Sequence, residues 1–130
     1  PVWGEVVRVA DTSFLYALIS TTDALHERAV RAAQESEPVT IPAEIFSETV
    51  ALVQYRSGFE EARAAGDWLR SQSLVQIGMG TEETLRETWR TFVQANGRLS
   101  YPDSVVVAWC RPRGFTPLAF DTRILAHARR

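Results

Sequence analysis

Residues 6–19 read VVRVADTSFLYALI, and the hydrophobic pattern of this stretch changes in its middle. Residues 6–10 form a short β-branched run of the kind that becomes a buried strand. The polar triplet Asp11-Thr12-Ser13 ends the run, and from Phe14 to Ile19 apolar residues recur at helical spacing. The stretch therefore predicts a strand, a tight turn and a helix.

The alternation of strand and helix continues along the chain. Short apolar strands are predicted at 39–41, 74–77 and 117–120, and helical spacing with suitable caps predicts helices around them. The helices are expected at 24 to about 35 behind an Asp23 cap, 42–57, 59–71, 81–96, from Ser100 through the apolar run 104–109, and after Asp121. This order predicts a mostly parallel sheet with helices on both faces, whose ligands bind beyond the C-terminal ends of the strands.

One of these helices carries an apolar pattern of its own. In the helix that opens at Thr81, Leu85, Trp89 and Phe92 are spaced to lie on one face. Residues with this spacing usually point into the core. We therefore expect this face to pack inward.

Length and composition set the class of protein. A chain of 130 residues predicts one domain over residues 1–130, and 45% hydrophobic with 23% charged residues predicts a folded chain. The longest apolar run, 105–110, is far shorter than the roughly 20 residues that a membrane span needs. The N-terminus has no basic stretch followed by an apolar one. We expect a cytoplasmic protein without a membrane partner.

The residue types exclude several chemistries. All 14 basic side chains are Arg, so P-loop NTPases, protein kinases and pyridoxal enzymes, which need a Lys, are excluded. Cys110 stands with only His26 and His127, which rules out a Cys/His zinc set, so any metal must be held by oxygen. The net charge of −2 argues against coating nucleic acid by bulk charge, but it leaves a local basic patch open.

Three aspartates occupy positions that allow two interpretations. Asp11 and Asp121 each follow a predicted strand, so both would point into the crevice at the strand ends. Each is also in a typical helix N-cap position, which is worth about 1 kcal/mol. Asp103 follows Ser100 by three residues and can equally be a first-turn acid that bonds back to Ser100. Taken singly, none of the three decides between cap and functional acid.

Glu44 and Glu48 lie one turn apart on the helix predicted at 42–57. At about 100° per residue, Glu48 projects about 60° from Ile45 and about 40° from Leu52, at the border of the apolar stripe. Glu44 falls farther from the stripe and within the first turn, where the helix dipole alone explains a carboxylate. We therefore choose Glu48 as the residue that faces the crevice.

The combined pattern resembles the PIN-domain ribonucleases, and most closely the VapC-type toxins of toxin-antitoxin pairs. The likeness is carried by DTSFLYAL at residue 11, SETVALV at 47, SYPDSVVVAW at 100 and PLAFDTRIL at 117. It implies a three-layer α/β sandwich whose central parallel sheet has four strands in the order 3-2-1-4. Relatives often add a short fifth strand to this sheet. The likeness also implies a catalytic cluster of Asp11, Glu48, Asp103 and Asp121.

Four clustered carboxylates repel one another, and hard divalent cations are their natural partner. The resemblance thus implies Mg²⁺ or Mn²⁺, with Asp11 and Asp103 as direct ligands and with Glu48 and Asp121 binding directly or through water. Thr12 and Ser13 would support the acids, or would simply be hydroxyls at a helix start. Ala119 departs from the family pattern, in which many relatives have Ser or Thr. The implied reaction is endonucleolytic hydrolysis of RNA by metal-activated water, with one or two metal ions.

The resemblance also implies partners. These are RNA, a cognate antitoxin protein and a second copy in a homodimer. Arg123, two residues from Asp121, is the best candidate for contact with RNA phosphates. Most of the large aromatic side chains sit at core spacing and are interpreted as packing, and none is assigned to RNA: Trp3, Tyr16, Trp68, Trp89, Tyr101 and Trp109. Two alternatives remain open, a PIN-like module that binds RNA or protein without cutting and an RNA-processing nuclease that is not a toxin.

Overall fold

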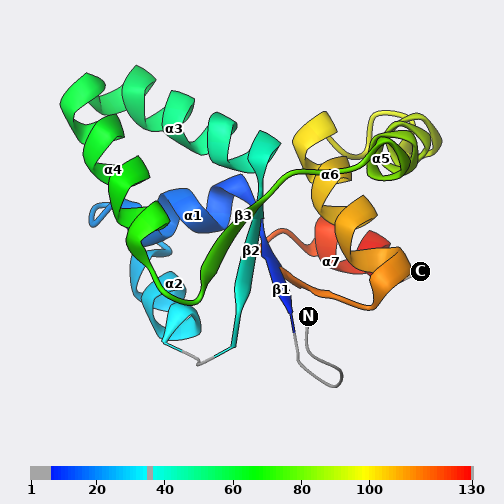
Figure 1. Cartoon of the computed structure of the whole chain (residues 1–130), viewed down its shortest axis with the longest axis horizontal. Coiled ribbons are helices and arrows are strands. Elements are labelled where there is room, and N and C mark those ends of the chain that lie inside the picture. The colour runs from blue at the N-terminus through cyan, green and yellow to red at the C-terminus, as the bar shows by residue number, and fades with distance from the viewer. Residues whose placement is uncertain (1–6, 35–36, 130) are drawn as a thin grey trace.

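The computed structural model describes residues 7–34 and 37–129 (Figure 1). The strands are β1 (Arg8–Ala10), β2 (Val39–Pro42), β3 (Val75–Gly78) and β4 (Thr116–Leu118). The helices are α1 (Thr12–Ile19), α2 (His26–Ala33), α3 (Ala43–Ser57), α4 (Phe59–Ser71), α5 (Glu82–Ala95), α6 (Tyr101–Cys110) and α7 (Thr122–Ala128), and a 3-10 turn (Arg111–Arg113) follows α6. Within the described residues, no helix combines the length and the apolar character that crossing a membrane requires.

The strands form a parallel sheet in the order β3-β2-β1-β4. Helices α1 to α4 lie on one side of this sheet, and α5 to α7 lie on the other (Figure 1). The predicted three-layer α/β architecture and strand order are confirmed, with four strands in the described part of the chain. The first strand of the sequence is central, and the last pairs with it at the edge.

Several element boundaries differ from the prediction by one or two residues. Asp23 accepts a hydrogen bond from the Leu25 N–H at 2.9 Å, but this bond closes a turn and α2 begins only at His26. The predicted ends of that helix and of the first strand, at Glu35 and Val6, lie outside the described residues. Strand β4 ends at Leu118 rather than at residue 120, because its pairing with β1 ends where β1 gives way to Asp11.

Arg8 is a charged side chain inside the central strand, and it is almost fully buried. Its guanidinium donates to the carbonyl oxygens of Ala32, at 2.8 Å, and Glu37, at 2.9 Å. The Glu37 carboxylate lies 3.7 Å from the Arg8 Nε. Carbonyl groups in the last turn of a helix lack partners within the helix. Arg8 therefore ties the end of α2 and the approach to β2 onto β1.

Helix α5 packs through a different face from the one predicted. Leu85 and Trp89 are 56% and 58% exposed, and only Phe92 of the expected face is half-buried. The buried residues of α5 are Thr84, Thr88, Thr91 and Ala95. The hydroxyls of Thr84 and Thr88 donate to carbonyl oxygens of their own turn, so these small side chains can be buried without unmet polar groups.

The interpretation of most large aromatic residues as packing holds for three of the five that the structure describes. Trp89 and Trp68, the latter 44% exposed, lie at the surface. Tyr16, Tyr101 and Trp109 are half-buried and do pack, whereas Trp3 lies outside the described residues. Side-chain spacing identifies the apolar side of a helix, but it does not identify which neighbour covers that side.

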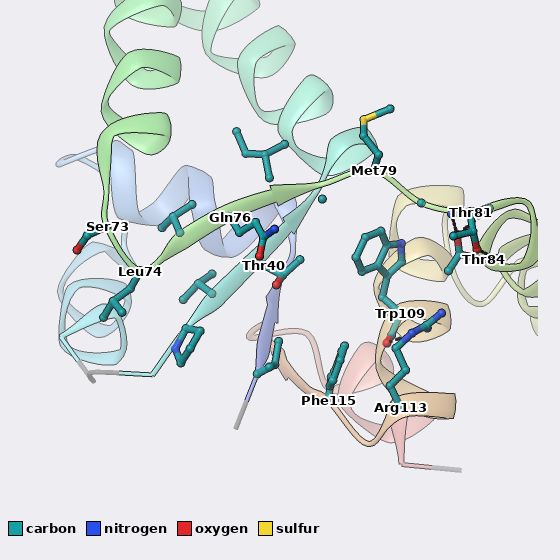
Figure 2. A pocket seen from close by; sticks show the side chains of 17 residues that line it. Thr40, Ser73, Leu74, Gln76, Met79, Thr81, Thr84, Trp109, Arg113 and Phe115 are labelled. Carbon is teal, nitrogen blue, oxygen red and sulfur yellow. Dashed lines mark hydrogen bonds between the residues drawn. The ribbon is translucent and has the colours of Figure 1, made fainter. Parts of the chain in front are cut away.

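A cavity of about 760 Å³ lies along β2 and β3 on the side of α6. Figure 2 shows Trp109 projecting from α6 across from Thr40 and Gln76 of the sheet. Gly78 permits this arrangement, because a Cβ there would lie 2.9 Å from the Trp109 ring. None of the described residues that line the cavity is Asp or Glu, so it is separate from the acids considered below.

Leu69 and Leu85 allow a comparison of a buried and an exposed helix face. Leu69 of α4 is 1% exposed, and Leu85 of α5 is 56% exposed. Leu69→Ala is expected to lower the free energy of unfolding by about 2–5 kcal/mol, since it leaves a cavity in the core. Leu85→Ala is expected to change it by less than about 1 kcal/mol. Urea denaturation followed by circular dichroism measures both changes. Equal losses would contradict the described packing of α5.

Candidate active site

The pairing of β1 with β4 brings together the segments that carry two of the acids. Ala10 is in register with Leu118, and the Asp11 N–H donates to the Leu118 carbonyl oxygen at 3.2 Å. Asp121 follows three residues later, at the start of α7. Figure 1 shows that α3 and α6 also begin at this end of the sheet. Two acids that are far apart in sequence thereby become neighbours beyond the strand ends.

Asp11 is a buried carboxylate, with 3% of its surface exposed. It is the N-cap of α1, and its Oδ1 accepts a hydrogen bond from the Phe14 N–H at 2.8 Å. Burial raises the pKa of Asp11 to about 6, and the Phe14 hydrogen bond offsets part of that rise. The negative charges of Asp103, Asp121 and Glu48 are smaller contributions to the same rise in pKa. All three other predicted acids are therefore close enough to act electrostatically on Asp11.

Asp103 is half-buried and takes part in a capping box at the start of α6. Its Oδ2 accepts from the Ser100 N–H at 3.1 Å, and the Ser100 hydroxyl accepts from the Asp103 N–H at 3.1 Å. The predicted cap is thus present. It uses one carboxylate oxygen and leaves Oδ1 without a hydrogen bond in the described part of the chain.

Glu48 is half-buried, and its Oε1 accepts a short hydrogen bond from the Thr12 hydroxyl. Glu44, one turn earlier on α3, is exposed. A cavity of about 350 Å³ beside Glu48 brings most of the predicted site together. It is lined by Asp11, Thr12, Ser13, Ile45, Glu48, Leu52, Ser100, Pro102 and Asp103.

Asp121 differs from the other acids because a guanidinium group holds both of its oxygens. It caps α7 through the Arg123 N–H at 2.8 Å, and the Arg123 side chain donates through Nε at 3.1 Å and Nη2 at 2.8 Å. These bonds hold the pKa of Asp121 below its usual value. Asp121 is not among the residues that line the 350 Å³ cavity. In this structure Arg123, predicted to contact RNA, acts first as the counter-ion of Asp121.

Comparison with known proteins adds an independent observation. A family model described as PIN domain matches residues 8–130. The chain belongs to the PIN-domain family. No curated protein matches its sequence.

Solved structures place this PIN domain beside VapC proteins. The crystal structure of Mycobacterium tuberculosis VapC20, described as a sarcin-ricin loop cleaving toxin, has 29% identity over 92% of this chain and 93% of that chain, with a TM-score of 0.81. VapBC2 from Rickettsia felis, bound to a DNA fragment from their promoter, has 9% identity over 94% and 95% of the two chains, with a TM-score of 0.71. The second likeness concerns the fold alone.

The donor chemistry of this PIN-domain site fits a hard divalent cation. Asp11, Glu48 and Asp103 offer carboxylate oxygens, which Mg²⁺ and Mn²⁺ prefer. A cation would offset both the burial of the Asp11 charge and its repulsion by the neighbouring acids, the two effects that raise the pKa of Asp11. Within residues 7–34 and 37–129, no three Asp, Glu, His or Cys side chains already form a group that could hold a metal ion. Binding a cation would therefore require the side chains to converge further.

The structure adds four residues that sequence reasoning did not assign to the site, among them Pro102 at the start of α6. Ile45 and Leu52 of α3 form an apolar wall, and Ser100 lies beside Asp103. The sequence did contain a signal for Ile45 and Leu52, because both belong to the apolar stripe at whose border Glu48 lies. The sequence signal for the ion pair between Arg123 and Asp121 was weaker, since a spacing of two residues does not show that the two side chains are in contact.

The raised pKa of Asp11 predicts a pH-dependent stability in metal-free buffer. Between about pH 4 and pH 6 the folded chain holds a proton on Asp11 that the unfolded chain, with a pKa of 3.8, has released. Proton binding to the folded state thus stabilises it at low pH, and the free energy of unfolding is expected to fall by up to about 3 kcal/mol as pH rises through this range.

Asp11→Asn supplies the comparison, because asparagine is also a good N-cap but does not titrate. Urea titrations at pH 4, 5, 6 and 7 with EDTA are expected to show the decline in the natural chain and a flatter profile in Asp11→Asn. Asp67→Asn, an exposed carboxylate on α4, serves as the control and should retain the decline. The same decline in Asp11→Asn would show that another group causes it.

Proposed function

We propose that this PIN-domain chain is a Mg²⁺- or Mn²⁺-dependent endoribonuclease and the toxin of a toxin-antitoxin pair. The observation that carries the proposal is the cluster of acids around buried Asp11 at the ends of β1 and β4. Membership of the PIN-domain family supports it. The RNA-cleaving toxin VapC20, similar over nearly the whole chain, supports the substrate class.

Asp11 and Asp103 would hold the cation, with Glu48 and Asp121 binding it directly or through water. When bound, the cation supplies a nucleophilic water at neutral pH and positive charge near the phosphoryl oxygens. Each of Asp11, Glu48 and Asp103 has one oxygen engaged by the fold, through Phe14 N–H, Thr12 hydroxyl and Ser100 N–H respectively. The second oxygen of each, Oδ2, Oε2 and Oδ1, has no hydrogen bond within the described residues and serves the reaction.

Glu48 is the residue that would orient the attacking water. The Thr12 hydroxyl fixes its Oε1, so that the other oxygen, Oε2, can accept a proton from water in the 350 Å³ cavity. Ile45 and Leu52 limit access of bulk solvent on this side. In-line attack would leave a 5′-phosphate and a 3′-hydroxyl without a covalent intermediate.

An antitoxin and a second copy of the chain are the protein partners of this proposal. Exposed apolar residues provide surface for them on two sides of the molecule. Tyr55 and Phe59 are exposed on α3 and α4, and Leu85, Trp89 and Val93 form an exposed stripe on α5. Surfaces of this kind are typical of interfaces with proteins.

Glu44 and Glu48 allow a matched test of the catalytic assignment, because both are carboxylates on α3. Glu48→Gln is expected to lower the cleavage rate of a labelled structured RNA in Mg²⁺ or Mn²⁺ by about a hundredfold or more, whereas Glu44→Gln should stay within about twofold. EDTA should abolish cleavage by the natural chain. The rate is measured by gel electrophoresis of the fragments.

The outcomes separate the alternatives. Cleavage that persists in EDTA and in Glu48→Gln would contradict a metal-dependent site at these acids. Binding of RNA without cleavage, across several structured RNAs, would favour the non-catalytic module.

The toxin role predicts an effect on growing cells. Induced expression of the chain in a bacterial culture is expected to arrest growth, because cleavage of an essential RNA stops translation, and Asp11→Asn is expected to relieve the arrest. Growth is followed by optical density, with the amount of each protein checked by immunoblot. An active nuclease that leaves growth unchanged would favour the RNA-processing role.

A further inference from the structure

A smaller pocket of about 180 Å³ lies between α5, the turn that follows α6, and α7. Figure 1 shows α5, α6 and α7 together on one side of the sheet. The pocket is lined by Thr91, Gln94, Ala95, Arg98, Arg111 and His127. Two guanidinium groups and an imidazole thus line one pocket, and none of its lining residues in the described part of the chain is acidic.

No carboxylate of residues 7–34 and 37–129 pairs with the guanidinium groups of this pocket. Arg98 is exposed, and its side chain makes no hydrogen bond or ion pair within residues 7–34 and 37–129. Arg111 donates only to neutral oxygens, the Thr91 hydroxyl at 3.3 Å and the His127 carbonyl at 3.5 Å. Several other arginines do have carboxylate partners, including Arg63, Arg86, Arg90 and Arg123. The pocket therefore concentrates unpaired cations in a chain of net charge −2.

His127 adds a third donor or acceptor at the edge of the pocket. Its Nδ1 lies 2.8 Å from the Arg123 carbonyl oxygen. A carbonyl oxygen only accepts, so Nδ1 carries the hydrogen of this bond. Nε2 is consequently the ring atom left for a ligand.

Short stretches of chain connect the pocket to the acidic site. Arg98 lines the pocket, and Ser100, two residues later, lines the 350 Å³ cavity of the acids. At 1.5 Å per helical residue, Arg111 lies about 12 Å along α6 from Asp103, and His127 lies about 9 Å along α7 from Asp121. A few nucleotides of extended RNA could span such a distance.

We propose that this pocket binds a phosphodiester group of the RNA substrate, a few nucleotides from the bond that is cleaved. The inference rests on the proposed function. Guanidinium groups bind phosphate oxygens through paired, charge-assisted hydrogen bonds, and Arg98 is free to do so. The pocket positions a substrate strand whose scissile phosphate lies at the acids, and its residues take no part in the chemistry.

Arg98 is the side chain to change, because it is exposed and makes no side-chain hydrogen bond or ion pair with the described residues. Binding of a fluorescein-labelled single-stranded RNA is measured by anisotropy in EDTA, so that cleavage does not interfere. Arg98→Gln is expected to weaken binding by about tenfold and to reduce the slope of log affinity against log salt concentration by about 0.7–1. Arg90→Gln, the control, removes an exposed arginine of α5 that is paired with Glu87 at 3.7 Å, and should change affinity less than twofold.

A second readout separates positioning from chemistry. With Mg²⁺ present and cleavage followed directly, Arg98→Gln should raise KM about tenfold and leave kcat unchanged, and its thermal unfolding should match that of the natural chain. An unchanged affinity and salt slope would overturn the phosphate site. So would binding of polyglutamate through Arg98 with unchanged RNA affinity, which would assign the pocket to an acidic protein partner.

These experiments distinguish a failure of the phosphate site from a failure of the proposed nuclease function. RNA binding that depends on Arg98, in a chain that does not cleave, would retain the phosphate site and reject the nuclease. Metal-dependent cleavage with the same KM in Arg98→Gln would retain the nuclease and reject the phosphate site.

Discussion

The burial of the Asp11 carboxylate is the constraint around which the acidic site is arranged. A carboxylate withdrawn from water loses hydration, and three neighbouring acids add repulsion, as the pKa of about 6 records. The same side chain starts α1 by accepting the Phe14 N–H. Its position cannot shift without disturbing the first turn of that helix and the hydrogen bond from Asp11 to β4. The Asp11 carboxylate, whose negative charge is disfavoured by burial and by its neighbours, is therefore also held firmly in place by the fold.

Helix capping and the proposed chemistry use the same side chains in this molecule. Asp11, Asp103 and Asp121 all lie at helix starts, where unpaired N–H groups and the helix dipole stabilise negative charge. In Asp11 and Asp103 the cap uses one oxygen, so fixing the side chain and keeping an oxygen available are compatible. Asp121 has both oxygens on Arg123, and Glu48 depends instead on the Thr12 hydroxyl. The cap interpretation of these aspartates and the site interpretation thus describe the same geometry.

The sequence predicted the architecture because strand and helix alternate with clear hydrophobic patterns, and the family resemblance supplied the strand order. It also favoured Glu48 over Glu44, since the angle from the apolar stripe separates a half-buried from an exposed position. Its errors concern tertiary contacts. The buried threonines of α5 look polar in sequence, yet their hydroxyls bond within the helix and leave Leu85 and Trp89 outside. The pairing of Arg123 with Asp121 depends on side-chain conformations, which spacing alone does not determine.

The strand order also has a consequence for how the site comes into existence during synthesis. Strand β1 is made first and β4 last among the strands described, and they pair only when the intervening helices and strands have been produced. Contacts between such distant segments form late, because a long loop must close before they gain stability. A nascent chain can assemble β1, β2 and β3 while Asp121 is still within the ribosome. The acids can thus come together only after β4 and Asp121 have been made, so the fold separates the synthesis of Asp11 from the completion of the candidate site.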